Sequence, residues 1–182
     1  MFHNTKKKQI ILVRHANAVE REDWKEKDFD RPLTPAGIHS NRIVSRYLKL
    51  IGIKPDRIVA SPATRTKSTA NDLAIKFWLD TIEFIRELYN EDGDTERKAM
   101  NVHLNIVHKN PKEERVLMIV WHNSDLSLFA SYLCGETVPS MKKWSVIVLS
   151  LPDTMEWKNV KAGSLKFIYY LTPHFLKLED LD

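Results

Sequence analysis

Short apolar runs alternate along the chain with longer segments in which apolar residues recur every three or four positions. The short runs predict strands over residues 9–14, 57–60, 82–88, 116–121, 144–151 and 165–171. The periodic segments predict helices after the caps Thr34 and Ser61, from Asp94 to about residue 108, and before Gly135. Strand and helix therefore alternate four times, and two further strands follow.

This alternation is typical of an α/β fold with three α/β/α layers and a mostly parallel central sheet. The last two strands are expected to form an antiparallel edge. The chain has 182 residues, which suits a single domain over residues 1–182, with residues 1–8 as a flexible arm. The apolar run behind Lys6–Lys8 is too short for a signal peptide or a membrane span. We therefore expect a cytoplasmic protein with no membrane partner.

Composition excludes several kinds of site. The five glycines are too widely spaced for either common glycine-rich phosphate loop. Cys134 is the single cysteine, so an intrachain disulfide and a cysteine-rich zinc site are excluded. The spacing of His103 and His108 does not suit a zinc pair, and a net charge of +4 does not favour nucleic acid. Asp28-Phe29-Asp30 lacks a buried strand before it and is interpreted as a charged loop, a lid over the pocket.

Candidate chemistry follows three of the predicted strands, where the carboxyl ends of parallel strands gather ligands. The residues that share this placement are Arg14 and His15, then Ser61 and Arg65, then His122 and Asn123. Arginine forks match phosphate oxygens, and histidine can attack phosphorus or donate a proton. Together these side chains predict a site that neutralises a transferring phosphoryl group without a metal.

Four segments carry a resemblance to a known family. They are residues 12–16 (LVRHA), 31–37 (RPLTPAG), 61–69 (SPATRTKST) and 120–123 (VWHN). In this order they resemble the histidine phosphatase superfamily, also called phosphoglycerate mutase-like. The short length and the RPLT segment look most like its SixA-type phosphohistidine phosphatases.

The resemblance implies a phosphatase that works through a phosphohistidine intermediate on His15. Arg14, Arg65 and His122 would hold the phosphoryl oxygens, with Asn123, Asn17 and Ser61 as further phosphate-binding or substrate-binding residues. No metal or organic cofactor is implied. The substrate it points to is phosphohistidine in a protein, with inorganic phosphate as product. The alternatives are a small-molecule phosphatase or phosphomutase of the same fold, and a phospho-ligand binding module without turnover.

The sequence departs from the family pattern in three places. Ala16 and Trp121 replace glycines, and Trp121 is expected either to narrow access to the pocket or to turn away from it. The third departure is Asn90, which stands where phosphomutases carry an acid. The acidic residues near it are Glu87, Glu91 and Asp92. A missing acid suits a phosphoramidate, whose leaving group needs less protonation than an alkoxide.

Overall fold

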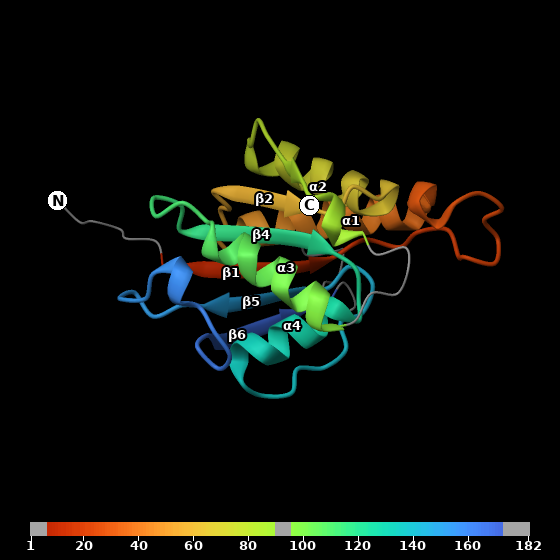
Figure 1. Cartoon of the computed structure of the whole chain (residues 1–182). Helices are drawn as coiled ribbons and strands as arrows, with labels where there is room; N and C mark the ends of the chain where they lie inside the picture. Colours follow the sequence, from red (N-terminus) through yellow and green to blue (C-terminus); the bar gives the residue numbers. More distant parts are fainter. Residues whose placement is uncertain (1–6, 90–95, 173–182) are drawn as a thin grey trace.

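A six-stranded sheet forms the centre of the protein (Figure 1). The computed structural model describes residues 7–89 and 96–172. The strands are β1 (Gln9–Arg14), β2 (Arg57–Ala60), β3 (Glu83–Phe84), β4 (Val116–Trp121), β5 (Val146–Ser150) and β6 (Lys166–Leu171), in the order β3-β2-β4-β1-β5-β6. β1, β2, β3 and β4 are parallel, whereas β5 is antiparallel to β1 and to β6. The predicted parallel sheet with an antiparallel edge is confirmed.

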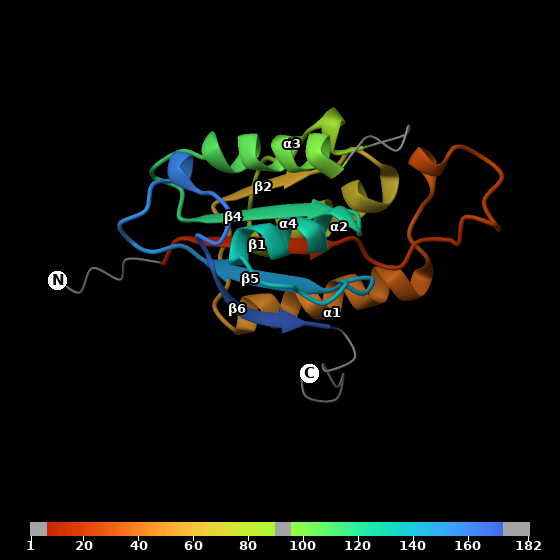
Figure 2. The same cartoon turned by 60° about the horizontal axis from the view of Figure 1, so that its bottom comes forward.

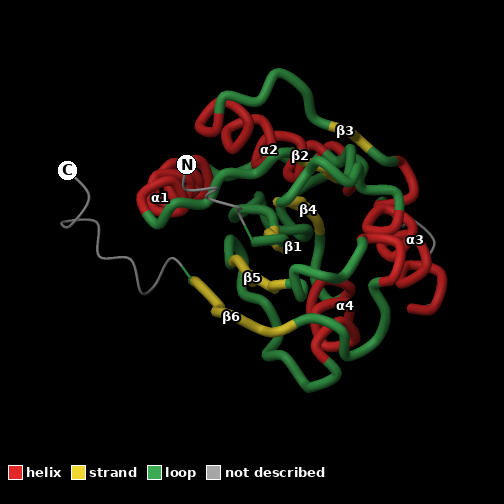
Figure 3. Tube along the Cα trace, turned by 90° about the vertical axis from the view of Figure 1, so that its left-hand side faces the viewer, coloured by secondary structure: helices red, strands yellow, loops and turns green. Residues whose placement is uncertain are grey.

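Helices cover both faces of this sheet. They are α1 (Pro35–Leu50), α2 (Thr64–Phe77), α3 (Glu96–His108) and α4 (Asp125–Cys134). Figure 2 and the view along the strands in Figure 3 place α1 and α2 on one face and α3 and α4 on the other. The side chains of β4 alternate between the two cores: Met118 packs with the α1–α2 cluster, and Leu117 and Ile119 pack with the α3–α4 cluster. The predicted three-layer α/β/α architecture is confirmed.

Three predicted boundaries are wrong. The strand expected over residues 82–88 is limited to β3, because the chain then turns into a 3-10 helix, η2 (Arg86–Leu88), that buries Leu88. β5 begins two residues late, since Trp144 has a φ of 56° and cannot continue a strand. α2 begins at Thr64 with Ala63 as its N-cap, so Ser61 is not the cap.

Parts of other predictions lie outside the described residues. Residues 1–6 of the expected arm and Asp94, the expected cap of α3, belong to these parts. Lys8 is described: it is buried, and its Nζ donates a hydrogen bond to the carbonyl of Met155. The chain is therefore already anchored at Lys8.

The RPLTPAG segment has a clear structural reason. Thr34 caps α1 by accepting a hydrogen bond from the Gly37 N–H at 3.0 Å, and Pro35 is the first helical residue. The Asn17 carbonyl accepts the Thr34 N–H at 2.9 Å, which brings the loop after β1 against the start of the helix. A Cβ at Gly37 would lie 2.0 Å from that carbonyl oxygen. Gly37 is therefore required for the loop and helix to approach this closely.

Replacement of Gly37 by Ala is expected to destabilise the fold by about 3 kcal/mol, because helix or loop must move to relieve the overlap. At an unconstrained position inside a helix, Gly→Ala raises the free energy of unfolding by about 1 kcal/mol. The sign of the change therefore shows whether the close approach at Gly37 constrains the fold. Chemical denaturation measures the effect, and the exposed His39→Ala on the same helix serves as control. A Gly37→Ala protein as stable as the wild type would show that the close approach is dispensable.

Candidate active site

His15 lies at the carboxyl end of β1, between β4 and the segment before β5. Its backbone N–H donates to the Trp121 carbonyl, and its carbonyl accepts from the Trp144 N–H. The side chain is only 6% exposed, and Nδ1 lies 2.7 Å from the Ala16 carbonyl oxygen. A carbonyl only accepts, so Nδ1 carries the hydrogen and Nε2 keeps its lone pair. Nε2 is therefore the nitrogen that can attack an electrophile.

His122 follows β4 and lies beside His15, with the ring centroids 5.3 Å apart. Its Nε2 is 3.1 Å from the Ser61 hydroxyl, and its Nδ1 is buried without a hydrogen-bond partner. If the hydroxyl donates to Nε2, the neutral ring carries its hydrogen on Nδ1. The Ser61 hydroxyl thus orients His122. A direct phosphate contact of Ser61 stays a prediction.

Two arginines complete the group, and each is held by its terminal nitrogens. Arg14 Nη1 donates to the Met141 carbonyl at 2.6 Å. Arg65 Nη1 donates to the Asp28 carbonyl at 2.7 Å, and its Nη2 donates to the Asp28 carboxylate at 2.8 Å. In both side chains Nε is buried and has no hydrogen-bond partner. Both guanidinium groups are therefore restrained in orientation, and each keeps a buried Nε–H without a partner.

Three of the buried side-chain nitrogens without a partner belong to this group: Arg14 Nε at the end of β1, Arg65 Nε in the first turn of α2 and His122 Nδ1 after β4. An unsatisfied buried donor costs about 1–3 kcal/mol, so native proteins keep few of them without a functional reason. The guanidinium charges of Arg14 and Arg65 act on both histidines, whose ring centroids lie 5.3 Å apart. The arrangement can bind an anion with several oxygens.

The two histidines are held in the neutral form. Burial, with the nearby Arg65, Arg14 and Arg31 charges, lowers the pKa of His15 to about 3. Burial and the neighbouring His15 and arginines also lower the pKa of His122 well below its ordinary value. At neutral pH the Nε2 lone pair of His15 is therefore available, and His122 is uncharged, with Nδ1 as a donor when the Ser61 hydroxyl donates to its Nε2.

The buried state of His15 predicts a pH-dependent stability. Because its pKa is near 3 when folded and about 6.5 in an unfolded chain, the unfolded state binds the proton first. The contribution of His15 is complete above pH 6.5 and is lost as pH falls towards 3. His15→Asn is therefore expected to become more stable than the wild type, relative to pH 7, by up to about 1.4 kcal/mol per pH unit below 6.5.

Urea denaturation at pH 7, 6, 5 and 4 measures this difference, and the exposed His39→Asn provides the control. Parallel stability curves for the wild type and His15→Asn would contradict the assignment of a buried, neutral His15.

The two asparagines expected to bind phosphate have different surroundings. The Asn123 amide donates to the Ser140 hydroxyl at 2.8 Å and accepts from Ser127, so it holds together α4 and the loop before β5. The backbone carbonyl of Asn17 accepts hydrogen bonds from the N–H and the hydroxyl of Thr34, the N-cap of α1. Direct phosphate contacts of Asn123 and Asn17 stay predictions.

Sequence reasoning missed the role of Asp28. It was interpreted as part of a charged lid, but its carboxylate contacts Arg65, Arg31 and the Tyr89 hydroxyl. One signal was present: Asp28 stands three residues before Arg31, an ion-pair spacing next to the RPLT segment. The contact with Arg65 has no such signal, because 37 positions separate the two residues.

Trp121 turns away from the candidate site. Its indole is 1% exposed, donates to the Leu88 carbonyl and packs 3.7 Å from the His103 ring. Trp121 was expected either to narrow access to the pocket or to turn away from it, and the structure shows the second arrangement. His103 is accordingly a packing residue.

Most of the segment expected to carry a general acid lies outside the described residues. Asn90, Glu91 and Asp92 lie outside the described residues, and Glu87 is an exposed residue of η2. Burial raises the pKa of Asp28, but Arg65 and Arg31 outweigh it and the net shift is downward. Asp28 is therefore ionised and is a poor proton donor.

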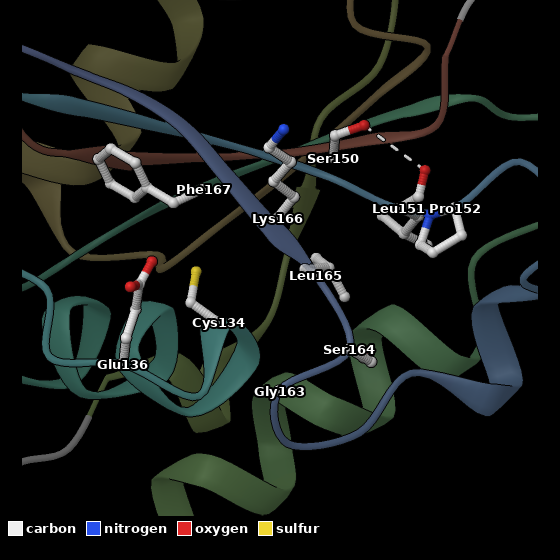
Figure 4. A pocket seen from close by; sticks show the side chains of 10 residues that line it. All are labelled: Cys134, Glu136, Ser150, Leu151, Pro152, Gly163, Ser164, Leu165, Lys166 and Phe167. Atoms are coloured by element: carbon white, nitrogen blue, oxygen red, sulfur yellow. Dashed lines mark hydrogen bonds between the residues drawn. The ribbon is translucent and has the colours of Figure 1, made fainter.

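A hollow separate from the candidate site lies between the end of α4, the end of β5 and the start of β6 (Figure 4). It measures about 630 Å³, and Cys134 and Lys166 are among its lining residues. Burial raises the pKa of the Cys134 thiol to about 11, so this cysteine is protonated and is not a nucleophile. Phosphoryl chemistry on cysteine is not supported there.

Within the described ranges 7–89 and 96–172, no group of three or more His, Cys, Asp or Glu side chains could hold a metal ion. Among the same residues, no helix has the length and hydropathy needed to cross a bilayer.

Comparison with known sequences identifies relatives of this chain. Residues 10–92 match the model of the histidine phosphatase superfamily (branch 1). An uncharacterized chloroplastic protein of Arabidopsis thaliana is 28% identical over 137 residues, covering 72% of this chain and 61% of that protein. The chain spans less than two thirds of the length of the curated relatives it matches.

Comparison with solved structures concerns the fold. The protein histidine phosphatase SixA in complex with tungstate matches with a TM-score of 0.74 at 20% identity, covering 93% of this chain and 99% of that one. A mycobacterial glucosyl-3-phosphoglycerate phosphatase matches with a TM-score of 0.64 at 14% identity, covering 88% and 96%. The matched segment 10–92 carries Arg14, His15 and Arg65, and the fold agrees with that of these phosphatases along most of the chain, so this segment is similar to the histidine phosphatase superfamily.

Proposed function

We propose that this protein is a phosphatase that transfers a phosphoryl group to His15 and then to water. The observation that carries the proposal is the set of three buried, unpartnered donors beside a histidine whose Nε2 lone pair is free. Arginine and neutral histidine donors suit the three equatorial oxygens of a phosphoryl group in transfer. The match of residues 10–92 to the histidine phosphatase model and the shared fold support the same chemistry.

In the first step, His15 Nε2 attacks phosphorus while the bond to the leaving group breaks. The P–Nε2 bond forms as the leaving group takes the electron pair of its own bond to phosphorus. Arg14 Nε, Arg65 Nε and His122 Nδ1 donate to the phosphoryl oxygens, where negative charge is greatest in transfer. The hydrogen bond from His15 Nδ1 to the Ala16 carbonyl stabilises the positive charge that develops on the ring.

In the second step, water attacks phosphorus, the P–Nε2 bond breaks and its electron pair returns to His15. The products are inorganic phosphate and the free enzyme. The same three donors serve both steps, and the proposed mechanism uses no metal.

We further propose phosphohistidine in a protein as the substrate. An imidazole leaving group accepts a proton easily and departs as a neutral ring, so it needs less help than an alkoxide. The ionised state of Asp28 supports this choice, since its carboxylate contacts Arg65, one of the two proposed phosphate-binding arginines, and is a poor proton donor. The cytoplasmic location expected from the sequence stays a prediction.

The test combines trapping of the intermediate with a substrate panel. The protein is mixed with ³²P-labelled phosphohistidine peptide, sugar phosphates, phosphoglycerates or nucleotides, and is quenched in alkaline detergent because P–N bonds are acid-labile. Label on the protein and release of phosphate support the mechanism. The highest kcat/KM on the peptide supports the substrate class.

Other outcomes favour the alternatives. A preference for phosphoglycerates or sugar phosphates would make this chain a small-molecule phosphatase with the same mechanism. Transfer of the phosphoryl group to a second small molecule would indicate a phosphomutase. If phosphate analogues bind but no donor gives labelled protein or free phosphate, the chain is a binding module and the catalytic proposal fails.

A further inference from the structure

Asp28 connects three separate parts of the candidate site. It begins a short 3-10 helix, η1 (Asp28–Asp30), in the loop that projects beyond the sheet at the right of Figure 1. One carboxylate oxygen accepts from Arg31, and the other accepts from Arg65 at 2.8 Å and from the Tyr89 hydroxyl at 3.2 Å. The loop after β1, the first turn of α2 and the end of η2 therefore meet at one side chain.

The contact with Arg65 determines which part of the guanidinium faces the site. Asp28 takes both terminal nitrogens, one with its backbone carbonyl and the other with its carboxylate. The buried nitrogen without a partner is Nε, on the side edge of the planar fork. Since the guanidinium is rigid, holding its end fixes the direction of the Nε–H bond.

The position of Arg65 makes such a restraint necessary. Its side chain is 5% exposed and its charge adds to those of Arg14 and Arg31 in repelling a proton from His15. Arg31 is tied to Asp28 as well and donates from Nη1 to the Val19 carbonyl at 2.7 Å. Without the Asp28 charge, two neighbouring guanidinium groups would lose their common anion and repel each other.

We propose that Asp28 is a positioning residue that holds Arg65 by the end of its fork and so directs its Nε–H towards the phosphoryl group. Asp28 acts through Arg65 and does not itself contact substrate. This inference rests on the phosphatase function proposed above, and it assigns a role to a residue outside the four family segments.

The variants Asp28→Asn and Asp28→Ala test this role, with Asp30→Asn as a control that makes the same charge change in the same exposed turn. Misplacement of a catalytic donor by about 1 Å costs about 100-fold in rate. We therefore expect kcat for both Asp28 variants to fall about 10–100-fold, with a smaller change in KM, whereas Asp30→Asn keeps the wild-type rate. Acetate is expected to restore part of the activity of Asp28→Ala and none of that of Asp28→Asn.

A double-mutant cycle separates positioning from a general loss of structure. If Asp28 acts through Arg65, Asp28→Asn causes no further loss of kcat in an Arg65→Ala background. Additive losses, or a wild-type rate for both Asp28 variants, would overturn the proposal. The urea midpoint of every variant is measured alongside, so that unfolded protein is not counted as slow enzyme.

Orthovanadate binding provides a readout that does not depend on turnover. Tryptophan fluorescence titration is expected to give about 10-fold weaker vanadate binding for Asp28→Asn and no change for Asp30→Asn. Failure of the proposed function would appear differently, as the absence of labelled protein from the wild type. Equal vanadate affinity in Asp28→Asn and wild type, with labelled protein present, would contradict the Asp28 role alone.

Discussion

Replacement of His15 by Asn is expected to abolish the labelled intermediate and to lower the rate of phosphate release by about 10⁴-fold or more. Asn has no ring nitrogen with a free lone pair, so no covalent bond to phosphorus can form at this position. The donors on Arg14, Arg65 and His122 remain, so vanadate should still bind to the variant. Rapid-quench labelling and phosphate release measure the two effects.

The control for this prediction is His39→Asn, which changes an exposed histidine on α1 far from the carboxyl ends of the strands. It should keep the wild-type rate and the labelled intermediate. If His15→Asn still hydrolysed the preferred donor at a wild-type rate, His15 would not be the nucleophile, and the proposed mechanism would be wrong.

Local signals in the sequence predicted the sheet and the strand-end residues well. Six apolar runs predicted six strands, and the order of strands and helices put Arg14, His15 and His122 after parallel strands. Thr34 with Pro35 predicted the start of α1, because cap and first-turn chemistry depend on adjacent residues. Features whose cause lies within a few residues could therefore be predicted from the sequence alone.

Features decided by distant contacts could not. Ser61 followed by Pro62 looked like a helix cap, but the hydroxyl contacts His122, 61 positions away, and the helix begins at Thr64. Asp28 looked like a charged surface residue because its partner Arg65 comes near only when the loop folds back over α2. In both cases a side chain has two partners to choose from, and the tertiary fold decides which it takes.

Trp121 illustrates the same limit on the core side. The alternation of β4 directs this side chain to the α3–α4 face, where it packs with Phe129 and His103. The next residue, His122, can then serve the site while the indole fills the core. A large residue in place of the family's glycine thus alters the packing under the site more than access to it.

Replacement of Arg65 by Lys is expected to lower kcat for the labelling step by about 10²–10³-fold, as for loss of one oxyanion donor. Lysine keeps the positive charge but has no Nε–H on a planar fork, and its single ammonium cannot be held at two terminal nitrogens by Asp28. Binding of the substrate's charge should survive, so KM is expected to change less than kcat.

The matched control is Arg42→Lys, an exposed arginine on α1 whose replacement should leave both constants unchanged. A wild-type kcat in Arg65→Lys would mean that charge alone is sufficient at this position, and the argument for a directed Nε–H donor would fail. A higher KM with an unchanged kcat would instead assign Arg65 to binding of the substrate in its ground state. The expected result, a loss in kcat, requires that Arg65 interacts more strongly with the phosphoryl group in transfer than with the bound substrate.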